Sequence, residues 1–136
     1  MPLVDASSPD SIRYSMKTWE RAERAVRCSP FQTRLFLVMW DASIPLRVIA
    51  GKTGVQNRYL QQPIGEVATE GELLWLIQVG VLRREVDGQG LTDSFRLTPL
   101  GRQLVEKWRN QGGNWLPPSW RDRLQNFFSR WIRIPL

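Results

Sequence analysis

Apolar residues recur every three or four positions along most of the chain, which is the spacing of amphipathic helices. This spacing predicts long helices over residues 12–26, 31–42, 66–79, 99–110 and 120–132. The helix over residues 66–79 draws its apolar set from Val67, Leu73, Leu74, Trp75, Leu76 and Ile77, and Gly80 follows it as a C-cap. Between residues 46 and 62 the pattern predicts two shorter helices, Arg47–Lys52 and Val55–Gln62, which Pro63 and Gly65 then interrupt.

Two segments after Gly80 are predicted to be strands. Residues 81–86 and 91–97 flank the turn-forming stretch Asp87-Gly88-Gln89-Gly90, so we expect a hairpin. In "RLTPLGRQLVEKW", which begins at Arg96, the two-residue period passes into a helical period within three residues. Pro99 begins that helix at a position where its missing N–H costs no hydrogen bond.

Three stretches, in this order, resemble a winged helix-turn-helix domain. "LRVIAGKTGVQNRYL" (46–60) is similar to a helix-turn-helix core, with Ala50 between two helices and Gly54 at the turn. "LLWLIQVGVLRREV" (73–86) is similar to the helix that leads through a glycine into the first wing strand. "FRLTPLGRQLV" (95–105) is similar to the second wing strand and the helix after it. The resemblance covers residues 31–108 and implies an α+β, mostly α fold with a two-stranded wing.

The sequence pattern and the resemblance together suggest how the chain is divided. Residues 1–10 are expected to form a flexible terminus, and residues 11–110 the winged helix-turn-helix domain with an added N-terminal helix. Residues 111–136 are expected to form a linker and a basic amphipathic C-terminal helix. With 42% hydrophobic residues, the chain has enough apolar surface for a real core.

The composition argues against an enzyme. The chain has no histidine and a single cysteine, Cys28, so the commonest general base is missing and a zinc site of the Cys/His type is excluded. Gly51-Lys52-Thr53 looks like the end of a phosphate loop, but Leu46 stands where the loop needs its first glycine. We therefore expect no catalytic activity, no metal and no cofactor.

The same composition bears on the compartment. No apolar run approaches the roughly 18 residues of a membrane-spanning helix, and the first thirty residues lack the basic-then-apolar layout of a secretion signal. A single cysteine suits a reducing compartment. We expect the protein to be cytoplasmic.

The net charge of +6 is spread unevenly. Residues 31–65 hold four basic and one acidic residue, and residues 101–136 hold seven and two, whereas residues 66–100 hold three and six. A basic excess favours polyanions such as nucleic acid or an anionic membrane, although it also serves solubility. If DNA is bound, we therefore expect residues 46–62, the wing arginines and the C-terminal tail to share the phosphate contacts.

The winged-helix resemblance implies a dimeric transcription regulator that binds double-stranded DNA. Arginine suits guanine and Asn or Gln suits adenine in the major groove, while lysine and threonine suit phosphates. Either Val55–Gln62 or Glu66–Val79 would face the groove, and the second begins with carboxylates that repel phosphate. The candidate DNA contacts are Lys52, Thr53, Gln56, Asn57, Arg58 and Gln61, together with the wing residues Arg83, Arg84 and Arg96.

The C-terminal segment carries a second candidate surface. Its aromatic and aliphatic side chains follow helical spacing, and its arginines fall mainly on other faces. Such a helix can pair with a second copy, bind another protein or lie on an anionic membrane. The alternative function is thus a non-enzymatic adaptor or assembly factor. The candidate interface residues are Trp115, Trp120, Leu124, Phe127, Phe128 and Trp131.

Overall fold

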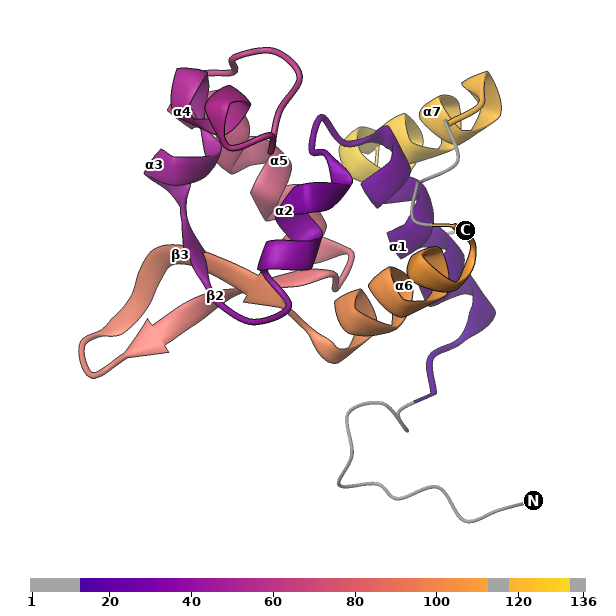
Figure 1. Ribbon diagram of the computed structural model, residues 1–136. Coiled ribbons are helices and arrows are strands. Elements are labelled where there is room, and N and C mark those ends of the chain that lie inside the picture. Colours follow the sequence, from indigo (N-terminus) through magenta and orange to yellow (C-terminus); the bar gives the residue numbers. More distant parts are fainter. Residues whose placement is uncertain (1–12, 113–117, 133–136) are drawn as a thin grey trace.

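The computed structural model describes residues 13–112 and 118–132. It is an α+β structure, mostly helical, with one small antiparallel sheet (Figure 1). The predicted terminus 1–10 and Trp115 lie outside the described residues. The elements follow in the order α1 (Met16–Cys28), α2 (Thr33–Val38), β1 (Ile44–Pro45), α3 (Leu46–Ile49), α4 (Gly51–Gln56), α5 (Glu66–Gln78), β2 (Leu82–Asp87), β3 (Gly90–Leu97), α6 (Pro99–Asn110), α7 (Trp120–Phe127) and a π-helical turn, η2 (Phe128–Ile132).

The predicted hairpin is confirmed, but the sheet has three strands instead of two. β2 and β3 pair antiparallel with Leu82 opposite Leu97. β1 pairs with the other edge of β3 and sets Ile44 opposite Phe95. The pattern of the sequence does not indicate β1, because a two-residue strand is too short for a period of two to be visible.

The junction after the hairpin is also as predicted. Thr98 is the N-cap of α6, and its hydroxyl accepts a hydrogen bond from the Gly101 backbone N–H at 3.0 Å. The Thr98 backbone N–H donates to the Val81 carbonyl oxygen at 3.0 Å, which ties the exit of β3 to the entry of β2. Pro99 takes the first helical position. The change of period in the sequence is therefore the capped start of α6.

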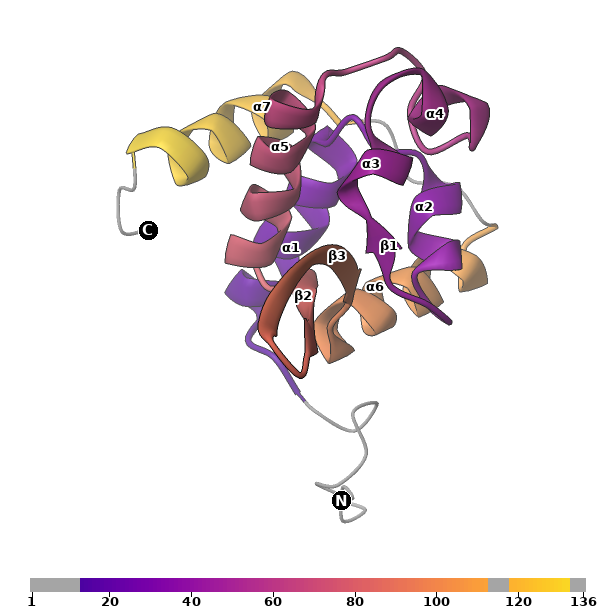
Figure 2. The same ribbon diagram turned by 90° about the vertical axis from the view of Figure 1, so that its left-hand side faces the viewer.

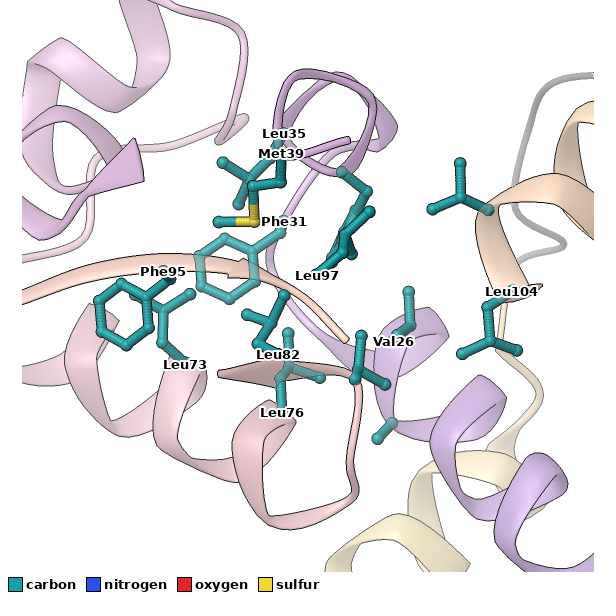
Figure 3. Packing of buried hydrophobic residues seen from close by; sticks show 14 of the residues in the cluster. Val26, Phe31, Leu35, Met39, Leu73, Leu76, Leu82, Phe95, Leu97 and Leu104 are labelled. Atoms are coloured by element: carbon teal, nitrogen blue, oxygen red, sulfur yellow. The ribbon is translucent and has the colours of Figure 1, made fainter. Parts of the chain in front are cut away.

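The core lies between the sheet and helices α1, α2, α5 and α6. Figure 3 shows Phe95 beside Leu73 and Leu82 beside Leu76, all four fully or almost fully buried. Burying a side chain of this size contributes about 1.5–3 kcal/mol. The same cluster includes Val26 of α1, Phe31, Leu35 and Met39 beside α2, and Leu104 of α6.

Helix α5 is less buried than its apolar spacing suggests. Val67 and Leu74, which belong to its predicted apolar set, are 88% and 43% exposed. The side of α5 that carries Leu73 and Leu76 faces the core. Trp75 is also buried and Ile77 is partly buried against the core, so only Val67 and Leu74 of the predicted apolar set are left on the surface.

The predicted helix Val55–Gln62 is wrong, and the predicted turn at Gly54 lies elsewhere. The chain breaks at Ala50 and Gly51, where Gly51 has φ +65°, and α4 then runs from Gly51 to Gln56. Gly54 lies inside α4, where an added Cβ would stand 1.8 Å from the Ile49 carbonyl oxygen. The absence of a side chain at Gly54 thus allows α3 and α4 to pack closely.

Residues 57–65 form a packed turn and loop in place of the second predicted helix. Arg58 has φ +64°, a left-handed conformation that ends α4. The backbone N–H groups of Tyr59 and Leu60 donate to the Gly54 carbonyl oxygen at 2.8 and 3.3 Å, and both side chains are buried. Their apolar spacing therefore reflects burial of a turn rather than a helix.

Candidate nucleic-acid interface and tail helix

Helices α3 and α4 and the tip of the hairpin lie on one side of the molecule, and α6 and α7 lie on the other (Figure 1 and Figure 2). On the first side, Lys52, Thr53 and Gln56 project from α4, and all three are exposed. Gln61 is exposed in the loop that follows. The structure therefore leaves these four predicted contacts accessible.

Asn57 and Arg58 differ from one another in their surroundings. The Asn57 side-chain nitrogen Nδ2 donates to the Val48 carbonyl oxygen at 3.2 Å, and the residue is half-buried. Asn57 thus ties the end of α4 back to α3 instead of presenting its amide outward. Arg58 is exposed beside it.

Two of the three predicted wing arginines are engaged within the protein. Arg84 donates to Glu70 of α5 at 3.4 Å and to the Thr92 carbonyl oxygen at 3.2 Å, and its guanidinium lies 4.9 Å from the centre of the Phe95 ring. Arg96 donates to Glu85 at 2.9 Å. Arg83 is exposed and has no carboxylate within 4 Å among the described residues.

The sequence-based prediction missed Arg47 in α3. This side chain is exposed on the same side as α4, and its polar position inside the 46–60 stretch was the available signal. Within residues 13–112 and 118–132, no carboxylate forms an ion pair with Arg47, Lys52 or Arg58. These three residues are called the corner cations below.

Helix α5 presents a different surface between the corner and the tail. It leads through Gly80, which has φ +92°, directly into β2. Its exposed positions include Glu66, Val67 and Leu74, while Glu70 holds Arg84. This outer ridge offers carboxylates and apolar groups rather than cations.

The tail helix α7 contacts the rest of the protein through polar side chains. Asp122 pairs with Arg27 of α1 at 2.6 Å. Asn126 accepts a hydrogen bond from the indole N–H of Trp75 at 2.9 Å. In η2, Arg130 donates to both oxygens of Glu72 at 2.9 and 3.0 Å and to the Gly71 carbonyl oxygen at 3.2 Å.

These three polar residues were not among the predicted site residues, although their spacing was visible. Asp122, Asn126 and Arg130 are four positions apart, so they share one side of a helix. Four of the predicted interface residues stay exposed instead. Trp120, Leu124, Phe127 and Trp131 are 71%, 46%, 50% and 64% exposed. Phe128 is half-buried and meets Phe127 edge-on at 5.9 Å between ring centres.

Asp122 also fixes the start of α7. Its carboxylate accepts the Ser119 backbone N–H at 2.9 Å while the Ser119 hydroxyl accepts the Asp122 backbone N–H at 3.1 Å, a reciprocal cap. The Ser119 backbone bond is the main reason why the pKa of Asp122 lies below its ordinary value. Arg27 lowers the pKa of this carboxyl further, although partial burial opposes both effects.

Neither a membrane span nor a metal-ligand cluster occurs in the described part of the chain. None of its helices is long and apolar enough to cross a bilayer. No group of three or more potential metal-ligating side chains gathers there. The exposed surfaces described above are the corner cations with Arg83, the outer ridge of α5 and the exposed side of α7.

Comparison with known proteins places the chain in one family. No curated protein and no solved structure matches it. A family model described as Npun_F0494-like matches residues 12–130, which covers every element from α1 to α7. The chain therefore belongs to the Npun_F0494-like family.

Proposed function

We propose that the protein binds double-stranded DNA through the corner cations and Arg83, and that it acts as a transcription regulator. The observation that carries the proposal is the group of exposed corner cations on α3, α4 and the turn after α4, none of which is paired with a carboxylate among the described residues. Arg83 of β2 is likewise exposed and without a carboxylate partner in that part of the chain. Phosphate contacts by Lys and Arg supply most of the affinity of proteins for DNA. A cation already paired with a carboxylate would have to give up that partner before it could contact a phosphate.

The order of elements supports this proposal. A strand, two short helices, a third helix and a β-hairpin follow one another from β1 to β3. We interpret this order as a winged helix-turn-helix in which α5 has the place of the helix nearest the wing. Because α5 exposes Glu66 and Val67, the proposal assigns the phosphate contacts to the corner and Arg83 instead of α5.

The proposal is tested by binding of random duplex DNA at several salt concentrations. The double variant Lys52→Gln/Arg58→Gln removes two phosphate contacts. We expect the slope of log K against log salt to become shallower by about 1.8, since each contact contributes roughly 0.9. The wild-type protein should be retained on duplex DNA at low salt and released as salt rises.

The matched control is Arg13→Gln/Arg21→Gln, which removes the same charge from two exposed positions. Arg13 precedes α1 and Arg21 lies within it. Its slope should stay close to the wild-type slope. If the wild-type protein does not bind duplex DNA at low salt, the proposal is wrong. If the control loses as much slope as the corner variant, binding reflects net charge and not the corner.

A protein-binding role is the second candidate, and the outer ridge of α5 favours it. Val67 is 88% exposed next to Glu66 in the helix that a winged-helix protein would present to DNA. Apolar groups beside carboxylates suit a protein partner better than phosphates. Loss of partner binding in Val67→Ser, with DNA binding unchanged, would favour this role.

A further inference from the structure

Helix α7 is attached to the protein by the opposite side from the one expected of an amphipathic helix. Such a helix normally turns its apolar side toward the core. Here Asp122, Asn126 and Arg130 face α1 and α5 through the polar contacts described above. Neither α7 nor η2 buries any residue.

The side that points away from the protein is apolar. Trp120, Leu124, Phe127 and Trp131 are spaced by four, three and four positions, so they form one stripe along the helix. Ile132, 47% exposed, adds to its end. We call these five residues the outward stripe. The outward stripe is exposed even though α7 contacts α1 and α5, because the polar contacts determine which side of the helix faces inward.

The charges beside the outward stripe have one sign. Arg121 and Arg123 are exposed. The single carboxylate of α7 and η2, Asp122, faces Arg27 instead. The outward side of the described tail therefore combines apolar groups with positive charge and offers no negative charge.

This combination fits an anionic bilayer surface better than a second copy of the same helix. Tryptophan prefers the headgroup region of bilayers, and a stripe of Trp, Phe and Leu flanked by arginines is typical of helices that lie in that region. Pairing two outward stripes would bring four guanidinium groups together without a carboxylate on either outward side. Anionic lipid supplies both the apolar layer and the opposite charge.

We propose that α7 and η2 bind an anionic lipid surface through the outward stripe, with Arg121 and Arg123 contacting lipid phosphates. Figure 1 and Figure 2 show that α7 lies apart from the hairpin tip and α4. Lipid binding would thus leave the corner cations accessible. The proposal does not depend on DNA binding, because the two surfaces share no residue.

The test is flotation of the full chain with vesicles of phosphatidylcholine alone or mixed with phosphatidylglycerol. The wild-type protein should float with the mixed vesicles and much less with phosphatidylcholine alone. Arg121→Gln/Arg123→Gln should lower the partition coefficient on mixed vesicles by about 25-fold, since each arginine near such a surface contributes roughly a fivefold effect. Leu124→Ser/Phe127→Ser should abolish flotation, because the stripe then loses two apolar groups.

The matched control is Val86→Ser/Leu91→Ser, which removes two exposed apolar side chains from the hairpin, 58% and 74% exposed. This variant should float like the wild type. Failure of the wild type to float with mixed vesicles overturns the proposal, as does an equal loss in the control. A wild-type dimer that Leu124→Ser/Phe127→Ser converts to a monomer, without any vesicle binding, would assign the stripe to a second copy instead.

Discussion

At the scale of single residues, the glycine at position 54 decides how α3 and α4 meet. An added Cβ there would lie 1.8 Å from the Ile49 carbonyl oxygen and 3.0 Å from a Leu60 methyl carbon. The first neighbour is backbone, so it cannot move aside without shifting α3. The sequence shows that residue 54 is a glycine, but it cannot show which backbone carbonyl oxygen an added Cβ would clash with.

We therefore expect Gly54→Ala to lower the free energy of unfolding by about 1–3 kcal/mol or more, the usual cost of overpacking a rigid site. Chemical denaturation measures the change. Gly88→Ala is the control, because nothing lies within 4 Å of its added Cβ. Its effect should stay within about 0.5 kcal/mol. Similar losses at both positions would contradict the proposed close contact.

At the scale of elements, the sequence predicted best where pattern and local chemistry agreed. The hairpin and the start of α6 were predictable because a turn signal, a period of two and an N-terminal proline coincide there. The predicted helix Val55–Gln62 is wrong, because Tyr59 and Leu60 are buried in a turn and their spacing matches that of apolar residues on one face of a helix. Burial and helical period coincide by chance over so short a stretch.

The capped start of α7 makes its stability depend on pH. Because the pKa of Asp122 is lowered in the folded protein, its contribution is complete above the unfolded value of about 4. The contribution is lost as pH falls through the lower, folded-state value. We expect Asp122→Asn to be less stable than the wild type at pH 7 and the difference to shrink in strong acid.

Thermal unfolding at neutral and acidic pH checks this expectation. Asp93→Asn, at an exposed position of β3, is the control for loss of one negative charge. A destabilisation by Asp122→Asn that is the same at pH 7 and at low pH would show that the ionised carboxylate is not what stabilises α7.

At the scale of the whole molecule, the candidate site was predicted less well than the fold. Most candidate residues are exposed, yet Asn57, Arg84 and Arg96 serve contacts within the protein. Composition can count arginines but cannot pair them with carboxylates from distant segments. The sequence likewise marked α7 as amphipathic without indicating which side faces inward, because this depends on Arg27, Glu72 and Trp75 of other helices.

A tail that buries none of its described residues and is held by the polar contacts described above should open more readily than the core. We expect amide hydrogens of α7 to exchange faster than those of α5 and β3, since local opening of α7 exposes little apolar surface. Arg130→Gln removes the ion pair with Glu72 and should speed exchange in α7 by about tenfold, which corresponds to roughly 1.4 kcal/mol.

Hydrogen exchange followed by mass spectrometry measures these rates by segment. Arg121→Gln is the control, because Arg121 lies in α7 itself and has no ion pair within the described residues. Exchange in residues 82–97 should be unchanged in both variants. Unchanged exchange of α7 in Arg130→Gln would mean that other contacts hold the tail.

Arg58 has a consequence for how members of this family diverge. Its left-handed backbone, with φ +64°, costs an ordinary side chain about 1–2 kcal/mol, whereas glycine adopts it freely. Where no positive charge is needed at position 58, we therefore expect glycine or asparagine to replace arginine. If the proposed DNA-binding role is right, glycine or asparagine at this position in another family member would mark a protein whose corner no longer contacts a polyanion.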